Sequence, residues 1–228
     1  MAVHAIILAR GGSKGIPAKN RIDFCGKPLL SWTVEQCCAA SCIDGVWVSS
    51  DSQELLDIAV HSGAEPIERP AHLAGDTATS EAGWLHAIGY LKGMGHEVEI
   101  VVAPQVTSPL REPGDFDRAV QKFRDEALDS LFSCSPAGDL CLWQQDDEGQ
   151  WQSINYDYKV RKRRQEFGRQ YIENGSFYLF KPAVLEKYGN RFGGKLGAFE
   201  MASWKAFEID EPEDVRFCSV IMKEYLLG

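Results

Sequence analysis

The sequence predicts an α/β fold built on a mainly parallel sheet. An apolar segment at 3–9 leads through a glycine-rich loop into an apolar-periodic helix at 29–40 and a second apolar segment at 45–50, which is the order of a parallel crossover unit. The continuous apolar run at 99–105 is typical of a central strand with both faces covered. The length of 228 residues suits one large domain, whereas two full domains would be cramped.

The remaining elements continue the alternation of helices and strands. Asp51 and Glu54 are typical of a helix N-cap and its supporting acid, and the helix that they open stops at Gly63. Further patterns predict helices near 81–92 and at 113–127, 183–189 and 211–226, and strands at 130–135, at 175–182 and, as a short one, near 205–209.

The alternation is interrupted between about 136 and 170. Aromatic residues there alternate with the acidic stretch DDEG and then with the basic run KVRKRR at 159–164. This pattern predicts an inserted antiparallel excursion whose exposed aromatics suit a partner subunit. The basic run admits three interpretations: a nucleic-acid patch, which the acidic remainder opposes; a nuclear-localisation signal, if the source is eukaryotic; and an arm that faces the substrate or a partner subunit.

Composition narrows the function classes. A net charge of −9 and a pI near 5.1 oppose general binding to nucleic acids or membrane surfaces, so a phosphate ligand would need a local cluster of cations. The seven cysteines lack paired metal-ligand spacing, and we expect reduced, mostly buried thiols and a cytoplasmic location. The first residues lack the features of a secretory leader, and no window reaches the roughly 18 apolar residues of a membrane span.

The loop ARGGSKGIPAKN at 9–20 follows the first strand, at the edge where open α/β sheets bind ligands. It matches neither GxGxxG nor GxxxxGK[ST]. Its glycines permit close backbone approach to an anion, and Arg10, Lys14 and Lys19 supply positive charge for phosphate oxygens. Asn20 can donate and accept at once and so can read a base edge. The alternative is an ordinary turn with solvated lysines.

An acidic pair lies close to the last predicted helix. Glu208 and Asp210 are two residues apart on the short predicted strand, so their carboxylates would face the same way. Carboxylates completed by phosphates and water are the ligands that Mg²⁺ prefers, and the pair therefore predicts a divalent-cation site. Asp210 also has an alternative as the N-cap of the final helix.

Five motifs resemble, in the same order, those of the CMP-sialic acid synthetases, the acylneuraminate cytidylyltransferases. They are LARGGSKGIPAKN at 8–20, RPAHLAGDTATS at 69–80, PQVTSPLR at 104–111, RQYIENGSFY at 169–178 and FEIDEPED at 207–214. The resemblance covers most of the chain. It implies a three-layer α/β nucleotidyltransferase fold of Rossmann-like type, with a small inserted dimerisation excursion and a homodimer or dimer of dimers.

The resemblance also implies a reaction. CMP would pass from CTP to the anomeric 2-hydroxyl of a free nonulosonic acid, namely an N-acylneuraminate or its deaminated form KDN, with release of pyrophosphate. Competing hypotheses are a CMP-Kdo synthetase-like enzyme and a non-catalytic nucleotide-binding module.

Residue roles follow from the same resemblance. Arg10 would lie beside the α-phosphate, Lys19 would serve the triphosphate and Asn20 would read cytosine, with Arg10, Lys19 and Asp210 as the catalytic residues. Asp210 and Glu208 would bind Mg²⁺, although many relatives have Asp where this chain has Glu208. Further nucleotide contacts are implied for Gly11, Gly12, Ser13, Arg69 and Ser80.

The resemblance places the sugar against a second group of residues. They are Gln105, Arg163, Arg169, Asn174 and Phe192. An arginine fork could pair with the sugar carboxylate. The alternatives are that Gln105 and Asn174 satisfy buried backbone groups and that Phe192 packs in the core.

Overall fold

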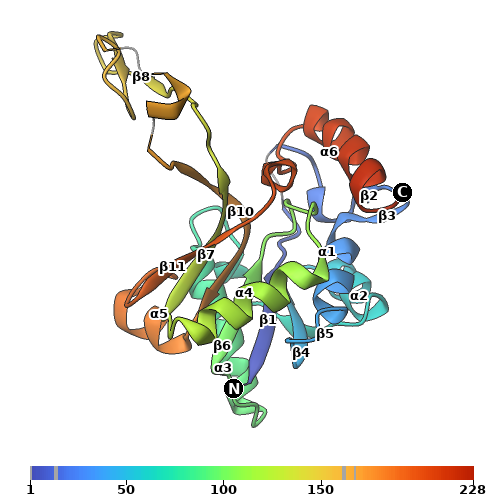
Figure 1. The fold of residues 1–228 in the computed structure, drawn as a ribbon. Coiled ribbons are helices and arrows are strands. Elements are labelled where there is room, and N and C mark those ends of the chain that lie inside the picture. Colours follow the sequence, from blue (N-terminus) through green and yellow to red (C-terminus); the bar gives the residue numbers. More distant parts are fainter. Residues whose placement is uncertain (1, 13–14, 161–162, 167) are drawn as a thin grey trace.

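The main sheet has seven strands, in the order β11-β7-β10-β6-β1-β4-β5. The computed structural model describes residues 2–12, 15–160, 163–166 and 168–228. β10 runs antiparallel to both of its neighbours and the other pairs are parallel, so the predicted mainly parallel sheet is confirmed, with β6 at its centre (Figure 1). The strands are β1 (Val3–Leu8), β4 (Gly45–Ser50), β5 (Glu65–Glu68), β6 (Ile100–Pro104), β7 (Ser130–Pro136), β10 (Tyr171–Phe180) and β11 (Leu196–Glu200).

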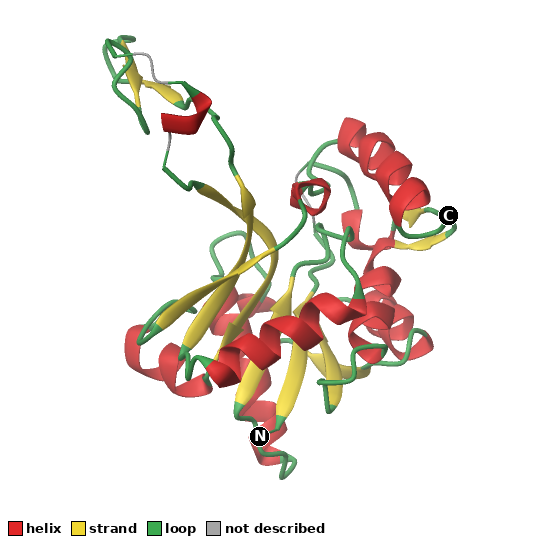
Figure 2. Cartoon of the chain, in the orientation of Figure 1, coloured by secondary structure: helices red, strands yellow, loops and turns green. Residues whose placement is uncertain are grey.

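Helices cover both faces of this sheet and make three layers (Figure 2). They are α1 (Leu29–Cys38), α2 (Gln53–His61), α3 (Ser80–Gly93), α4 (Pro113–Asp125), α5 (Pro182–Tyr188) and α6 (Pro212–Tyr225). Successive strand residues point to opposite faces. On β1, Ala5 and Ile7 pack in one core cluster with residues of α1, α2, α4 and α6, whereas Ile6 packs in the other with α3 and α5. The strands are therefore buried on both sides, as their continuous apolar runs predicted.

Helix starts follow local side-chain chemistry. The Asp115 carboxylate accepts from the Glu112 N–H (2.8 Å) at the start of α4, and Asp214 accepts from the Glu211 N–H (2.7 Å) at the start of α6. The predicted cap of α2 was wrong. Ser52 holds the N-cap position, and the Asp51 carboxylate instead accepts from the backbone N–H of Gly11 (3.0 Å).

The predicted strand near 205–209 was also wrong. A 3₁₀ turn, η4 (Ser203–Ala206), is followed there by irregular backbone. The buried Lys205 explains the difference, because its Nζ donates to Glu112 (2.7 Å) and Asp115 (2.6 Å) and so holds the segment against α4 instead of a sheet edge. Parallel pairing with β7 is made by β11, which the sequence pattern did not indicate.

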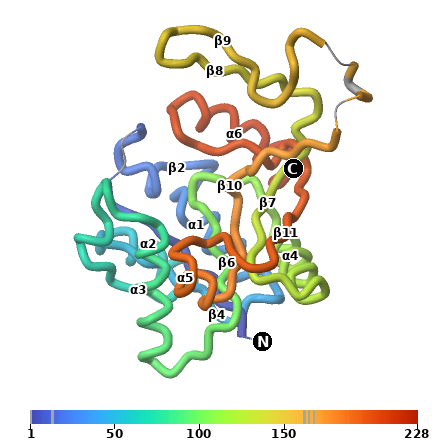
Figure 3. Tube along the Cα trace, turned by 90° about the vertical axis from the view of Figure 1, so that its left-hand side faces the viewer, coloured from blue at the N-terminus to red at the C-terminus, as the bar shows by residue number. Residues whose placement is uncertain are grey.

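The described residues between 137 and 170 form an arm. β7 and β10 lead into the arm, which extends away from the body of the sheet (Figure 1). The arm lies on the same side of the molecule as α6 (Figure 3). The arm contains an antiparallel hairpin of β8 (Trp143–Gln145) and β9 (Trp151–Ser153), in line with the predicted antiparallel excursion. Three of its aromatics, Trp143, Trp151 and Tyr158, are exposed, with Trp151 63% accessible to solvent.

Smaller elements complete the chain. A two-stranded ribbon follows the glycine loop, and four 3₁₀ turns connect larger elements: β2 (Asp23–Phe24), β3 (Lys27–Pro28), η1 (Lys19–Arg21), η2 (Ala71–Leu73), η3 (Arg164–Glu166) and η4. All seven cysteines are free thiols; Cys37, Cys134 and Cys218 are buried, while Cys38 and Cys141 are exposed. Across the described ranges, none of the helices has the length and apolar character that a membrane crossing requires.

A buried histidine makes the stability of this fold pH-dependent. The Trp47 Nε1–H donates to His4 Nδ1 (3.1 Å), so His4 Nε2 carries the proton that is donated to the Glu97 carbonyl (3.0 Å). Burial lowers the pKa of His4 below its ordinary value, because the charged imidazole loses its hydration. The folded state thus binds this proton less readily than the unfolded chain. The stabilisation is present above the unfolded pKa and is lost as the pH falls.

We expect His4→Gln to expose this dependence. The amount by which the parent's unfolding free energy exceeds that of the variant should shrink between about pH 8 and about pH 5.5, because the unfolded parent takes up a proton at His4 that the folded parent resists, whereas the variant has no such group. Urea unfolding at a series of pH values measures it. A difference that stays constant, or grows as the pH falls, would contradict this account of His4.

Candidate nucleotide-binding site

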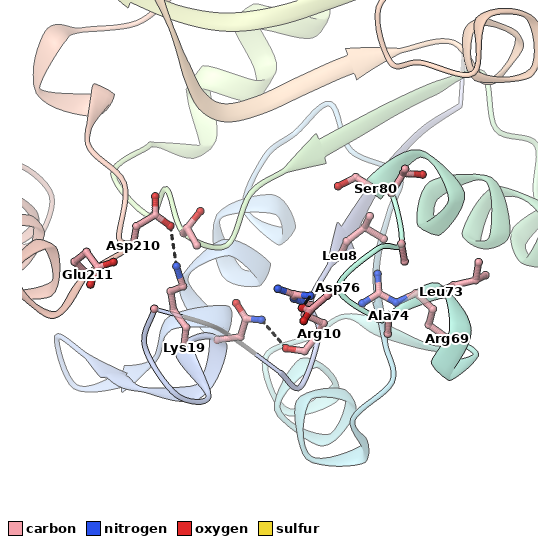
Figure 4. Close-up of a pocket in the computed structure, with 16 residues that line it drawn as sticks. Leu8, Arg10, Lys19, Arg69, Leu73, Ala74, Asp76, Ser80, Asp210 and Glu211 are labelled. Carbon is pink, nitrogen blue, oxygen red and sulfur yellow. Dashed lines mark hydrogen bonds and ion pairs between the residues drawn. The ribbon is translucent and has the colours of Figure 1, made fainter. Parts of the chain in front are cut away.

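A polar cavity of about 620 Å³ lies at the carboxyl end of β1 (Figure 4). The glycine loop, the segment after β5, the start of α3 and the segment before α6 all contribute to its wall. Parallel strands end at the same edge of a sheet, which explains why loops distant in sequence meet there. The sequence-predicted residues among its lining are Arg10, Lys19, Asn20, Arg69, Ser80 and Asp210.

Lys19 joins the glycine loop to the C-terminal part of the chain. Its Nζ donates to the Ile209 carbonyl (2.9 Å) and to the Asp210 carboxylate (2.8 Å). The Lys19 side chain is only 12% exposed, whereas that of Asp210 is 60% exposed. Gly15 lies against the same segment, where an added Cβ would be 2.5 Å from the Asp210 carbonyl oxygen. Only glycine permits this approach.

Arg10 stands across the cavity from Lys19 (Figure 4). Its Nη1 donates to Asp76 (2.9 Å), and its carbonyl accepts from the Asn20 side-chain amide (3.0 Å). Asp76 could have capped α3, but Thr79 is the cap and its Oγ1 accepts from the Ala82 N–H (3.2 Å). Likewise, Glu211 and not Asp210 occupies the N-cap of α6. Both aspartates therefore line the cavity, each in a pair with a cation, and neither caps a helix.

Arg69 supplies a buried cation. Its Nη2 donates to the Ala9 carbonyl (3.1 Å), while its buried Nε has no hydrogen-bond partner in the described part of the chain. Burial lowers the pKa of this guanidinium below its ordinary value, and nearby Asp51 opposes that shift. Arginine stays charged under these conditions. Arg69 therefore brings a positive charge to the cavity wall.

The charges that line the cavity balance one another. Among the described lining residues there are three cations and three acids, namely Arg10, Lys19, Arg69, Asp76, Asp210 and Glu211. The Arg10–Asp76 and Lys19–Asp210 pairs are partly exposed, and such pairs are worth at most about 1 kcal/mol each. Phosphate oxygens could therefore replace the carboxylates at small cost.

Gln105, Gly175 and Glu208 form a second group close in sequence or space to Asp210, which we call the second wall; it lies outside the described lining of the cavity. An added Cβ on Gly175 would lie 3.4 Å from a Glu208 carboxylate oxygen and 3.5 Å from the side-chain oxygen of Gln105. Gly175 has φ +64°, which favours glycine. Burial raises the pKa of Glu208 above its ordinary value, and the charge of Asp210 raises the pKa further.

The two predicted metal ligands suit only part of a cation site. Across the described ranges, no group of three or more His, Cys, Asp or Glu residues could hold a metal ion. Glu208 and Asp210 repel each other enough to shift a pKa, and a divalent ion would relieve that repulsion. Two carboxylates fit Mg²⁺ when ligand phosphates and water complete its coordination.

Other predicted sugar contacts lie elsewhere. Asn174 is buried, and its amide bonds to Ser133 (2.6 Å) and Ser135 (3.0 Å), which matches the alternative of satisfying buried groups. Phe192 packs edge-on against Tyr178, at 5.7 Å between ring centroids, as its packing alternative proposed. A sugar contact from either residue stays a prediction.

The predicted arginines and the remaining loop residues are placed as follows. Arg163 and Arg169 are exposed on the arm and do not line the cavity of this chain. Gly11 and Gly12 follow Arg10 in the glycine loop but are not among the residues that line the cavity. Ser13 lies outside the described residues.

Sequence reasoning missed three residues that build the site. Asp51 was assigned to a cap, although its position directly after β4 places it at the ligand edge of a parallel strand. Lys205 and Arg111 are buried cations, and only the tertiary structure shows what they bond to.

An α/β sheet with a cation-lined cavity at this edge is typical of proteins that bind nucleoside phosphates. The chain belongs to the cytidylyltransferase family, whose family model matches residues 4–192. The predicted likeness to CMP-sialic acid synthetases is thus confirmed at the level of the family.

Curated relatives point to two kinds of sugar. The chain is 32% identical over 211 residues to N-acylneuraminate cytidylyltransferase A of Danio rerio. This alignment covers 91% of this chain and 48% of the relative. The chain therefore spans about half the length of that relative. It is 29% identical over 224 residues to a pseudaminic acid cytidylyltransferase of Campylobacter jejuni, with 96% of this chain and 95% of the relative covered.

Solved structures support the fold. A CMP:2-keto-3-deoxy-manno-octonic acid synthetase, determined in complex with CTP, superposes with a TM-score of 0.75 at 19% identity and covers 99% of this chain and all of its own. A 4-diphosphocytidyl-2C-methyl-D-erythritol synthase gives a TM-score of 0.71 at 11% identity, with 97% and 99% covered. At these identities the likeness concerns the fold alone.

The contact between Gly15 and the Asp210 backbone can be tested by substitution. We expect Gly15→Ala to lower the unfolding free energy by roughly 1–3 kcal/mol, because backbone must move to admit the methyl group. Gly12→Ala is the matched control, since the described residues leave open space around Gly12, and it should stay within about 0.5 kcal/mol of the parent. Chemical denaturation measures both. Equal losses in the two variants would contradict the proposed packing of the loop.

Proposed function

We propose that this protein transfers CMP from CTP to the anomeric 2-hydroxyl of a free nonulosonic acid, an N-acylneuraminate or its deaminated form KDN. The observation that carries the proposal is the convergence of Arg10, Lys19, Arg69 and Asn20 on one cavity in a chain of the cytidylyltransferase family. The relatives named above act, by their names, on sugar acids of this class.

The cavity suits the parts of CTP. Arg10 and Lys19 face each other across it and can bind phosphate oxygens from two sides. Lys19 is also held by the Ile209 carbonyl, so its position does not depend on the Asp210 carboxylate. The Asn20 amide is buried at the loop end, and the Arg69 guanidinium together with the Ser80 hydroxyl can meet the base or ribose, since both residues line the cavity.

These residues favour transfer by positioning and by charge. The sugar hydroxyl oxygen bonds to the α-phosphorus and gives up its proton to water, the bond from that phosphorus to the bridging oxygen breaks, and pyrophosphate leaves. Negative charge grows on the α-phosphate oxygens and on the pyrophosphate. Arg10 would stabilise the first and Lys19 the second, in a pocket that holds both cations in place beforehand.

Mg²⁺ is the divalent cation that we propose for this reaction. A triphosphate brings several negative charges into a cavity whose described lining is electrically balanced, so an added cation is required for tight binding. Asp210 and Glu208 would hold the ion, which would neutralise phosphate charge and align the leaving group. Asp210 can turn to it because Lys19 keeps a backbone partner.

The sugar would lie along the wall formed by Gln105, Gly175 and Glu208. A carboxamide suits a polyhydroxylated ligand because it can donate and accept. In a homodimer, the exposed arm of a second copy could bring Arg163 or Arg169 to the sugar carboxylate, which fits the exposure of the arm aromatics.

A turnover panel tests the proposal. Purified protein with CTP and Mg²⁺ should release pyrophosphate with N-acetylneuraminic acid or KDN, and pseudaminic acid and Kdo complete the panel. Activity confined to Kdo would favour the CMP-Kdo synthetase-like alternative. CTP binding by calorimetry without turnover on any acid would favour the non-catalytic module and would overturn the assignment.

Lys19 provides the sharpest test of the nucleotide site. We expect Lys19→Met to lower kcat/KM for CTP by roughly 100- to 1,000-fold, because the variant loses a fixed cation beside the phosphates. Arg21→Met removes a cation two residues away whose side chain pairs with Glu54 at the surface, and it should stay within about two-fold of the parent. Steady-state kinetics decides between them. Similar losses in both variants would show that Lys19 acts only through the general charge of the loop.

A further inference from the structure

Arg111 is a buried cation that the reaction as described does not use. It follows β6 in the segment that leads to α4, and it is 1% exposed. The structure gives it no carboxylate as a hydrogen-bond partner within the described residues. Burial lowers the pKa of this guanidinium to about 10, so it remains charged at neutral pH. A buried charge of this kind is costly unless its donors are satisfied.

Neutral oxygens satisfy its donors. On the α1 side, Nε donates to the Gln36 side-chain oxygen (3.0 Å) and Nη2 donates to the Thr33 hydroxyl (2.6 Å). On the other side, Nη1 donates to the Ser176 carbonyl (2.7 Å) and Nη2 donates to the Gln105 carbonyl (3.0 Å). The guanidinium thus ties α1 to the end of β6 and to the middle of the neighbouring strand β10.

The Ser176 and Gln105 carbonyls lie where the regular pairing of β6 with β10 ends. The last β6–β10 pair in the ladder is Pro104 with Phe177, and β10 has an irregularity between Glu173 and Tyr178. Beyond that pair, the Gln105 N–H donates to the Ser176 carbonyl (3.0 Å). The arginine fork adds two bonds to carbonyls at this irregularity and so holds the end of β6 and the middle of β10 in a fixed relation.

The positions of Gln105 and Ser176 determine the shape of the second wall, along which we propose that the sugar lies. Gly175 lies between the Gln105 side chain and the Glu208 carboxylate, directly before the residue whose carbonyl Arg111 binds. If Ser176 or Gln105 moved, the Gln105 side chain would move with them. None of the Arg111 bonds reaches the residues that line the nucleotide cavity.

We infer that Arg111 is a positioning residue for the sugar acid, acting through the backbone of Gln105 and Ser176. The inference rests on the proposed function, because it names the group that shapes the sugar side of that site. A lysine could not replace it, since a point charge on a flexible stem cannot bind both carbonyls and both α1 partners at once.

Arg111→Lys tests the inference through the two substrates separately. We expect the KM for the sugar acid to rise about ten-fold or more, because misplaced contacts weaken sugar binding. The Kd for CTP, measured by calorimetry, should stay within about two-fold of the parent, since the nucleotide cavity keeps all its residues. A merely structural role would weaken both substrates together or neither.

Two further variants keep the test decisive. Phe123→Leu removes buried volume from α4 without removing a hydrogen bond, and it shows how general destabilisation affects each constant. Thr33→Val removes only the Nη2 partner on α1 and should raise the sugar KM in the same direction, by about three-fold or more. Thr33→Val carries the test by itself if Arg111→Lys does not fold.

The outcomes distinguish a failure of the role proposed for Arg111 from a failure of the proposed function. An active parent whose folded Arg111→Lys and Thr33→Val variants keep the parental sugar KM, or lose CTP affinity to the same degree as sugar affinity, overturns the inference alone. A parent with no turnover on any acid of the panel contradicts the proposed function, and the role of Arg111 falls with it.

Discussion

One contact between distant parts of the chain holds the site together. Lys19 Nζ bonds to the carbonyl of Ile209, 190 residues further along, and to the carboxylate of Asp210. The close approach of Gly15 to the Asp210 backbone supports the same junction. Without it, the glycine loop would be an ordinary turn and the acidic segment an ordinary helix lead-in. The sheet makes the junction possible because its strand ends deliver the loops to one edge.

Charge explains why this edge can take a triphosphate although the chain is acidic. The net charge is −9, but three cations gather at the cavity and two of them are held by exposed acids. Such pairs keep the cations in place while the site is empty and cost little to exchange for phosphate. The buried cations Lys205 and Arg111 serve the fold in another way, since they fix the segments that carry Glu208 and Gln105.

Most of the fold could be predicted, and the misses have physical causes. The strands predicted at 45–50 and 99–105 each contain a run of apolar residues, which in the second indicates burial on both faces, and both strands were confirmed. The strand expected near 205–209 failed because an ion pair with α4, invisible in the local pattern, competes with sheet pairing there. The edge strand β11 was missed because it is short and half exposed, which leaves little apolar signal.

The functional site, like the fold, could be predicted only in part. Arg10, Lys19 and Asn20 could be found because their loop follows a strand and combines glycines with cations. Asp210 could be found because it stands two residues from a second acid, and the cavity brings all four residues together. The partners of Asn174 and Arg111 depend on strand register and on a break in pairing, which no local pattern encodes. Asp51 was predictable in part. Its sequence context is typical of a helix cap, but its carboxylate accepts from the glycine loop, which the capping pattern did not indicate.

Hydrogen–deuterium exchange of the protein with and without CTP and Mg²⁺ tests the central claim most directly. The account predicts slower exchange of backbone amides in three separate segments, at 9–12 and 15–21, at 69–80 and at 207–214, because the nucleotide would bridge them. Exchange in the β8–β9 hairpin should not change on CTP binding alone. Protection confined to other segments, with the glycine loop and the segment before α6 unaffected, would contradict it.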